Sequence, residues 1–305
     1  MPKAKPPKGA TAVAQGDVKA LIQALAGDGW KVRSDAADAL GELGDPQAVE
    51  GLIEALGDPE NVVKRSAAAA LGRLRDPRAA QPLTWLLWQG HNDSYVTGPV
   101  VDALVNIGSE AVEGIENCIR ENVSFNLRVP AAAVLGRIGG ERAVRFLIEL
   151  LSEKPQPGNE HYANWNTRAA VVTALGEIGD PTATDAVISV LLRKSPSDFL
   201  KTQYAAAHAL DKLGWEPGVD RVSAFYWAAK FKWVKCVELG SLAFEPVVLL
   251  LDEPGQDLKI DAAVCLGQLG DRRAIKPLVK LRKTAGAFGG GEDIDEALRK
   301  LGWKG

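Results

Sequence analysis

A short string of small and apolar residues returns along the chain at nearly constant intervals. It reads ALGELGDP at 39–46 and comes back in altered form at 70–77, 134–141, 174–181 and 265–272. Its third residue, or the counterpart where the string has changed, is called the marker residue. It stands at positions 41, 72, 105, 136, 176, 211, 237, 267 and 299, so most intervals are 30 to 35 residues long. Such a period indicates stacked, similar units rather than independent domains.

Each unit has the pattern of a pair of helices. The first helix, as in VRSDAADALGELG (32–44), is rich in alanine, and the second, as in AVEGLIEAL (48–56), is rich in leucine, isoleucine and valine. Apolar residues at i, i+3, i+4 and i+7 predict that both helices are amphipathic. We therefore expect an all-α fold of about eight to nine helix pairs, because the string or its counterpart occurs at nine positions.

The string itself predicts a joint between two helices and contains no reacting group. Gly44 stands where a helix ends and a positive φ is favoured, and Asp45 can cap the next helix, with Pro46 in its first turn. Gly41 lies inside the first helix, where glycine costs about 1 kcal/mol relative to alanine. Its recurrence in this chain predicts close packing against a neighbouring unit.

The pattern VRxxAAxALGxLGDPxAVxxLIxxL resembles the HEAT-like repeats first grouped with phycobilisome lyases, over nearly the whole chain from about residue 17. The resemblance implies an α-solenoid, one continuous domain over 17–305, with the Ala-rich first helices on its concave face. The stretch 213–251 resembles a spacer of such proteins and implies an irregular unit of shorter helices near 213–245. Residues 292–305 are expected to form a C-terminal cap, and the basic, Pro-rich residues 1–16 a disordered tail.

The composition argues against several classes of partner. The chain has 36 basic and 39 acidic residues, a net charge of −3, which gives no general attraction to nucleic acid. No apolar run approaches the roughly 20 residues that span a membrane. Cys118, Cys236 and Cys265 lie far apart among apolar neighbours, which predicts buried thiols in a reducing compartment. Because residues 1–16 lack the apolar core of a secretion signal, we expect a cytoplasmic protein with no nucleic-acid or membrane partner.

The motifs of common catalytic sites are missing from the sequence. None of the three histidines, His91, His161 and His208, is followed by glutamate, so the His-Glu ligand pairs of a di-iron hydroxylase built from such repeats are absent. There is no closely spaced Cys or His pair for zinc and no GxSxG elbow, and the loop GAFGGGED lacks the ending of a phosphate loop. We expect no metal, no cofactor and no catalytic activity.

Specialised function is expected where the repeats are interrupted. Longer segments at 85–99, 152–166 and 194–204 predict inter-repeat loops along one edge, and they bring in aromatic residues. With the exposed positions of the first helices they form a candidate partner-binding surface of Tyr95, Tyr162, Trp165, Tyr204, His208, Lys212, Glu177 and Arg137. Rigid aromatic anchors in polar surroundings are typical of binding hot spots. The alternative is that the tryptophans fill gaps between irregular repeats.

These observations favour a non-catalytic scaffold or adaptor that binds another protein or peptide through its concave face and aromatic edge. The resemblance leaves a second possibility open, a phycobilin lyase-like or chromophore-chaperone subunit. In that case a groove with Tyr162, Trp165, Tyr204 and His208 would hold a planar tetrapyrrole.

Overall fold

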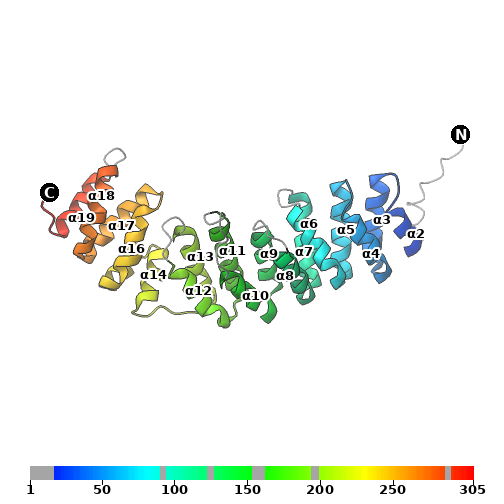
Figure 1. Cartoon of the computed structure of the whole chain (residues 1–305), viewed down its shortest axis with the longest axis horizontal. Helices are drawn as coiled ribbons and strands as arrows, with labels where there is room; N and C mark the ends of the chain where they lie inside the picture. Colours follow the sequence, from blue (N-terminus) through cyan, green and yellow to red (C-terminus); the bar gives the residue numbers. More distant parts are fainter. Residues whose placement is uncertain (1–16, 90–93, 122–126, 153–161, 194–198, 286–289) are drawn as a thin grey trace. The chain divides into compact units, whose positions relative to one another are not determined.

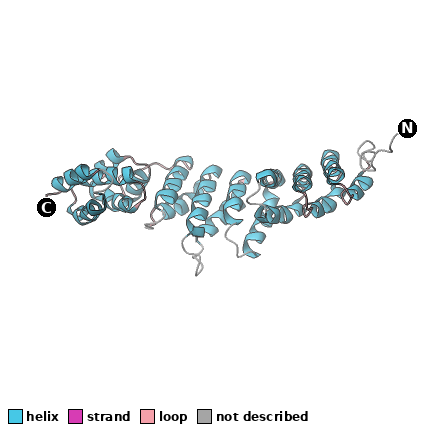
Figure 2. Cartoon of the chain, turned by 90° about the horizontal axis from the view of Figure 1, so that it is seen from above, coloured by secondary structure: helices cyan, strands magenta, loops and turns pink. Residues whose placement is uncertain are grey.

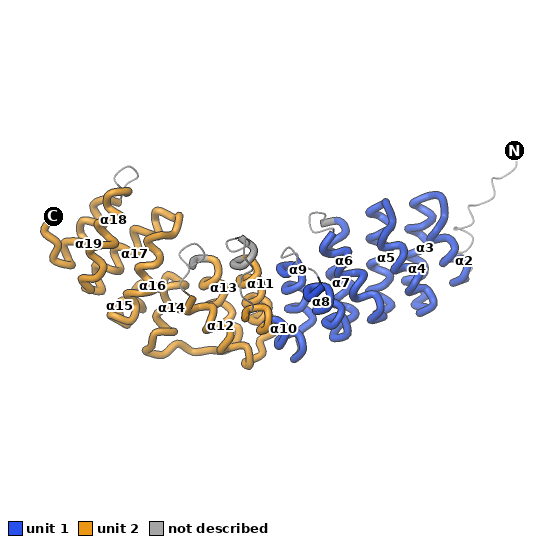
Figure 3. The backbone as a smooth tube through the Cα atoms, in the orientation of Figure 1, with its two compact units in different colours: residues 1–147 blue, residues 148–305 orange. Residues whose placement is uncertain are grey.

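The computed structural model describes residues 17–89, 94–121, 127–152, 162–193, 199–285 and 290–305 (Figure 1). Throughout these ranges the regular structure is helical and no strand is found in them (Figure 2). The all-α prediction is therefore confirmed. The chain divides into two compact units, Met1–Leu147 and Ile148–Gly305 (Figure 3).

The first unit is built from two layers of helices. The first helices of its repeats are α3 (Trp30–Leu43), α5 (Asn61–Leu74), α7 (Ser94–Ile107) and α9 (Arg128–Ile138). The second helices are α2 (Val18–Ala24), α4 (Val49–Ala55), α6 (Ala80–Gln89) and α8 (Ser109–Glu121), and α10 (Gly140–Ser152) continues past the end of this unit. Helix α5 packs between α3 and α7 in one layer, and α6 packs on α8 in the other.

The second unit repeats this arrangement with one irregular part. Its first helices are α11 (Tyr162–Ile178), α13 (Phe199–Lys212), α17 (Gln256–Leu269) and α19 (Gly291–Lys300), and its second helices are α12 (Thr184–Leu191), α14 (Arg221–Ala229), α16 (Phe244–Leu249) and α18 (Ile275–Ala285). Between α14 and α16, α15 (Trp233–Glu238) takes the place of a first helix, and both α15 and α16 have only 6 residues. The shorter helices expected in this stretch are therefore present.

The recurring string forms the predicted joint. Helix α3 ends at Gly44, whose φ of 67° lies in the left-handed region that favours glycine. The carboxylate of Asp45 then accepts a hydrogen bond from the N–H of Gln47 at 2.9 Å. Pro46 begins a single 3-10 turn, η1 (Pro46–Ala48), which leads into α4. Equivalent turns follow Asp76, Asp180 and Asp271, as η2 (Pro77–Ala79), η4 (Pro181–Ala183) and η7 (Arg272–Ala274).

Inside the first helices, the glycine of the string touches the backbone of the next first helix. A Cβ atom added at Gly72 would lie 2.7 Å from the Cα of Ala103, far inside van der Waals contact. The same approach, at 2.7 to 2.8 Å, joins three further pairs, Gly41 with Ala70, Gly176 with Ala209, and Gly267 with Ala297. The close packing predicted for Gly41 is therefore confirmed, and these contacts set the spacing of the stacked helices.

A partly buried ion pair fastens the start of α3 to the turn before α5. Arg33 donates from Nε and Nη2 to the two carboxylate oxygens of Asp58, at 2.6 and 3.0 Å, and from Nη1 to the carbonyl of Gly27 at 3.0 Å. The hydrogen bonds of this pair raise the pKa of Arg33 and lower that of Asp58. Gln203 stands eight residues before Asp211, as Arg33 stands eight residues before Gly41. It makes a similar contact, donating from Nε2 to the carbonyl of Arg193 at 2.7 Å.

The glycine contact can be tested with two substitutions on one pair of helices. We expect Gly267→Ala to destabilise the second unit by about 1–3 kcal/mol, because the added methyl must push α17 away from Ala297 of α19. Gly291 lies in α19 with nothing within 4 Å of an added Cβ, so we expect Gly291→Ala to stabilise by about 0.4–1 kcal/mol. Urea unfolding measures both, and equal effects of the two substitutions would contradict the packing argument.

Candidate interaction surface

The outward positions of the first helices are exposed, as the repeat pattern predicts. We call this surface the first-helix face, and describe it separately in each unit. In the first unit its exposed members are Asp35, Glu42, Arg65, Arg73, Asp102, Asn106 and Arg137. In the second unit they are Thr173, Glu177, Tyr204, His208 and Lys212. Asp38, the remaining position of the pattern, is partly exposed.

Several aromatic residues expected in inter-repeat loops lie on helices instead. Trp85 and Trp88 belong to α6, where their rings stack with centroids 4.6 Å apart, and Tyr95 lies in the first turn of α7. The loop prediction is wrong for these residues because α6 and α7 extend further than the repeat pattern indicates. Tyr162 and Trp165 similarly fall in α11. His91 and His161 lie outside the described residues, as do the side chains of Tyr162 and Trp165.

In the first unit, the exposed side chains of this face pair with one another. The Arg65 guanidinium lies over the Tyr95 ring, 5.0 Å from its centroid. Arg137 donates to the carboxylate of Asp102 at 2.9 Å, which links α9 to α7. Two of the predicted site residues, Tyr95 and Arg137, are therefore engaged in contacts within the chain. Ion pairs between exposed side chains, such as that of Arg137 with Asp102, contribute little to stability.

The second unit carries a denser group of aromatic side chains. Tyr204 and His208, one turn apart on α13, meet edge to face with ring centroids 4.3 Å apart. The ring of Phe231 lies nearly parallel to that of Tyr204 at 6.4 Å, and Trp233 lies 6.0 Å from Phe231. Tyr204 is 45% exposed. We call these four residues the aromatic surface.

Phe231 adopts a backbone conformation that aromatic residues rarely take. Its φ is 55°, and it follows the end of α14 at the position where glycine usually terminates a helix. The hydrogen bonds are those of a Schellman turn, with the N–H of Lys232 donating to the carbonyl of Trp227 at 2.9 Å and that of Phe231 to Ala228 at 3.1 Å. The left-handed conformation costs a residue with a Cβ about 1–2 kcal/mol. Strain of this kind often marks a position where the side chain serves a function.

Next to His208 of the aromatic surface lies a group of polar side chains centred on Asp211. The hydroxyl of Tyr226 donates to Oδ1 of Asp211, and the ammonium of Lys230 donates to Oδ2 at 2.5 Å and to the Tyr226 hydroxyl at 3.2 Å. His208 brings its Nδ1 to 3.7 Å from the same carboxylate. The Tyr226 ring packs edge to face on Trp215 and Trp227, with centroids 5.3 and 4.8 Å away. These contacts hold α14 against the end of α13.

The pKa values of this group are shifted away from neutral pH. Burial alone would raise the pKa of Asp211, but the hydrogen bonds from Lys230 and Tyr226 outweigh it and lower the pKa. Burial, reinforced by the bond to Asp211, raises the pKa of Tyr226. Burial would lower the pKa of Lys230, yet its bonds to Asp211 and Tyr226 raise it. The group therefore consists of a carboxylate, a phenol and an ammonium over the physiological range.

The sequence carries a signal for this group, namely an aspartate where the repeats usually have glycine. Asp211 occupies the marker position at which Gly41, Gly72 and Gly176 stand, where a side chain would strike the next first helix. A carboxylate can stand there because α15, the next first helix in the chain, has only 6 residues. Phe231, Trp233, Tyr226 and Lys230 were not among the predicted site residues, since their contacts depend on the path of the irregular unit.

Glu177 and Lys212 lie at the ends of neighbouring first helices. Glu177 is exposed near the end of α11, and Lys212 is the last residue of α13. Gly179, just past the end of α11, faces the carbonyl of Lys212, which an added Cβ would approach to 3.9 Å. Both side chains are exposed in the second unit.

Other kinds of site receive no support from the described residues. In these ranges no three His, Cys, Asp or Glu side chains gather in a way that could hold a metal ion. None of the helices observed there is both long and apolar enough to cross a membrane. Cys118, Cys236 and Cys265 are buried, as predicted, and burial raises the pKa of Cys118 to about 11.

The strain at Phe231 can be isolated by comparing two substitutions that both remove the ring. We expect Phe231→Gly to be more stable than Phe231→Ala by about 1 kcal/mol, because only glycine relieves the left-handed backbone. In an ordinary helical position the order is reversed. Urea unfolding of the two variants measures the difference, and an alanine variant at least as stable as the glycine variant would contradict the conformation described.

The Asp211 group predicts a pH-dependent contribution to stability. The folded pKa of Asp211 lies below the unfolded pKa of about 3.8, so its contribution is present above that pH and is lost as pH falls through the folded pKa. We expect Asp211→Asn to cost about 1 kcal/mol at neutral pH, a modest figure because the carboxylate is 34% exposed. The deficit relative to wild type should shrink in urea unfolding at about pH 3. A deficit that stays constant would show that the charge is not responsible.

Comparison with known proteins agrees with this architecture. The family model of HEAT repeats matches residues 18–105 and 160–234, more than half of the chain, and that of the PBS lyase HEAT-like repeat matches 127–153 and 258–283. No curated protein matches the chain.

Several solved structures are similar to the chain at low sequence identity. An engineered protein is 19% identical, covering 98% of this chain and 92% of its own, with a TM-score of 0.33. The complex of CpcE and CpcF of phycocyanin lyase from Nostoc sp. PCC7120 is 24% identical over 78% of this chain and 88% of its own, with a TM-score of 0.33. Importin beta is 17% identical over 95% of this chain and 46% of its own, with a TM-score of 0.42. The repeat period, the two-layer helix pairs and the extent of the family match lead to one assignment: the chain belongs to the family of HEAT-repeat proteins.

Proposed function

We propose that the protein is a non-catalytic scaffold that binds a segment of another protein on the first-helix face of its second unit. The observation that carries this proposal is the aromatic surface, with Tyr204 exposed beside Phe231 on a strained turn. Stacked repeats offer extended surfaces for such contacts. The aromatic rings would act as anchors for the partner.

The chemistry of the surroundings favours a protein segment as the ligand. Tyrosine, phenylalanine and tryptophan supply large contact areas at a low cost in side-chain entropy, and hot spots are commonly surrounded by polar residues. Here two exposed charged residues lie next to the rings in the chain and form the border, since Lys212 follows His208 by one turn of α13 and Lys232 stands between Phe231 and Trp233. The border would set the orientation of a bound segment, and the rings would supply most of the affinity.

The absence of catalysis is part of the proposal and is supported by the titration of the nearby groups. General acids and bases work best with a pKa near the working pH. The pKa values of Asp211, Tyr226 and Lys230 are instead shifted further from neutral pH. The Cys118 thiol is buried and its pKa is raised. The polar group around Asp211 is thus suited to hold α14 in place.

Quantitative affinity purification from the native cell tests the proposal. We expect at least one protein to be retained by the wild type and depleted about tenfold or more by the double variant Tyr204→Ser/Phe231→Gly, because losing hot-spot anchors costs about 2 kcal/mol each. Trp30→Ser is the matched control, since Trp30 is another aromatic residue, 49% exposed, in the first unit. An identical set of proteins from wild type and double variant, with both folded by circular dichroism, would contradict the proposal.

A second candidate is binding of an open-chain tetrapyrrole, favoured by the match of two segments to the PBS lyase HEAT-like repeat. In that case the aromatic surface would stack on the planar ligand. Adding phycocyanobilin to the purified protein should then shift its visible absorption spectrum, and Tyr204→Ser should weaken the shift. An unchanged spectrum would rule out the tetrapyrrole candidate and leave the scaffold as the one function proposed.

A further inference from the structure

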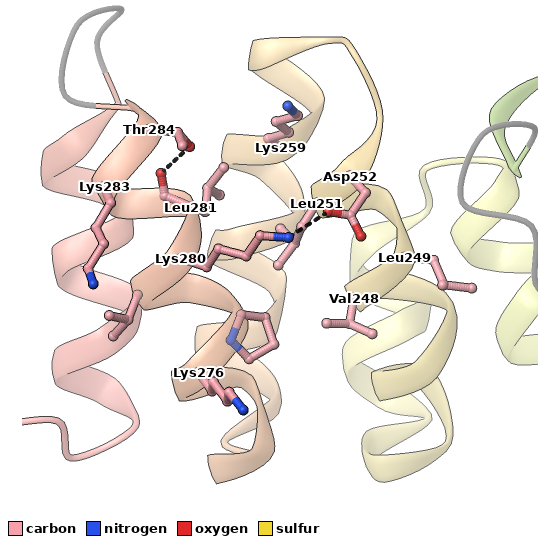
Figure 4. A pocket seen from close by; sticks show the side chains of 12 residues that line it. Val248, Leu249, Leu251, Asp252, Lys259, Lys276, Lys280, Leu281, Lys283 and Thr284 are labelled. Atoms are coloured by element: carbon pink, nitrogen blue, oxygen red, sulfur yellow. Dashed lines mark hydrogen bonds and ion pairs between the residues drawn. The ribbon is translucent and has the colours of Figure 1, made fainter.

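The second unit contains a groove that the aromatic surface does not include. It has a volume of about 820 Å³ and lies between α16 with the following turn η6 (Leu250–Asp252), α17 and α18 (Figure 4). Its apolar lining consists of Val248, Leu249, Leu251, Pro277, Val279 and Leu281. The lining belongs to the second-helix side of the repeats, so the groove is separate from the proposed anchor site.

The charged residues of the groove are nearly all basic. Lys276, Lys280 and Lys283 come from α18, and Lys259 comes from α17, against a single acid, Asp252. The three lysines of α18 are spaced i, i+4 and i+7, which places them along one side of the helix. Acidic residues outnumber basic ones in the chain, 39 to 36, so the positive charge of this groove is a local feature.

Only one of these lysines has a partner among the described residues. Lys280 reaches across the groove to Asp252, at 3.7 Å between Nζ and Oδ1 (Figure 4). The two side chains are 80% and 56% exposed, so water screens the pair and an incoming carboxylate can replace Asp252 at little cost. Lys276 and Lys283 are exposed without an ion pair in the described part of the chain.

We propose that this groove binds an acidic amphipathic helix of a partner protein. Apolar side chains of the helix would occupy the space between Val248 and Pro277, and its carboxylates would pair with the lysines. The lining part of α18, from Lys276 to Thr284, is about 12 Å long at 1.5 Å per residue, which matches about two turns of a bound helix. Helices that bind in grooves present apolar residues at i, i+3, i+4 and i+7, with polar residues flanking them.

The chain's own N-terminal segment does not have this chemistry. Residues 1–16 carry Lys3, Lys5 and Lys8 and no acidic residue, so they would be repelled by the lysines of the groove. The occupant must therefore bring negative charge from elsewhere. The proposal does not depend on the aromatic surface, because the two sites share no residue and can be disabled separately.

The probe for the test is a fluorescein-labelled helical peptide with leucines at i, i+3, i+4 and i+7 and glutamates on the flanking positions. In fluorescence anisotropy with the full-length protein, we expect saturable binding that weakens as NaCl rises from about 50 to about 500 mM. Lys276→Glu/Lys283→Glu should lower the affinity about tenfold or more, because two of the lysines that would pair with the peptide are reversed in charge. The matched double reversal Lys19→Glu/Lys304→Glu, at exposed lysines outside the groove, should leave it unchanged.

A third variant changes the affinity in the opposite direction. Asp252→Asn removes the acid that competes for Lys280, and we expect it to bind the peptide about two- to fivefold more tightly. Peptides with every glutamate changed to glutamine, or every leucine to serine, should not bind. Thermal unfolding confirms that each variant is folded.

Three results would overturn the proposal. The first is equal affinity of the wild type and the Lys276→Glu/Lys283→Glu variant, both folded. The second is equal binding of the glutamine or serine peptides. The third is that phosphatidylserine vesicles or a short single-stranded DNA bind through these lysines while the acidic peptide does not, which would assign the groove to a different anionic partner.

Discussion

The structure depends on one contact, the approach of a glycine to the backbone of the next first helix, which recurs in α3, α5, α11 and α17. Where Gly72 meets Ala103, the two helices are so close that no side chain fits between them. The spacing of the stack follows from this contact, and so does the orientation of the faces on either side. The contact also limits where a site can form, because a helix that must present glycine and alanine inward has only its outward positions for polar or aromatic residues.

The irregular unit relaxes this limit. At Asp211 the glycine is gone and the neighbouring first helix is short, so a carboxylate can extend from α13 and gather Tyr226 and Lys230 from α14. That polar group fixes the end of α14, and the end of α14 in turn holds Phe231 in its left-handed conformation beside Tyr204. An interruption of the repeat thus becomes a position where an exposed tyrosine and a partly exposed phenylalanine are held side by side.

Local features of the sequence were sufficient to predict much of this. The period, the helix pairs, the capping of the joint by Asp45 and the exposure of the first-helix face all depend on residues close together in the chain. They were predicted correctly for that reason. The extent of α6 and α7 was not, because helix ends depend on contacts such as that of Arg65 with Tyr95, more than two dozen residues away. Of the aromatic surface, Tyr204 and His208 were predicted from their place on a first helix. Phe231 and Trp233 were not, since nothing local brings them to α13.

The two parts of the repeated string differ in how far their effects reach. The cap of Asp45 on the N–H of Gln47 is complete within three residues, so it forms in the same way wherever the string is inserted. The contact of Gly41 with Ala70 needs a partner in the following repeat. A duplicated repeat that carries both the glycine and the matching alanine therefore contains its own joint between helices and its own packing contact with the next repeat. Such an array can gain or lose internal repeats while every remaining junction stays intact, whereas a duplication of the stretch around Asp211 would leave a junction that no neighbour fits.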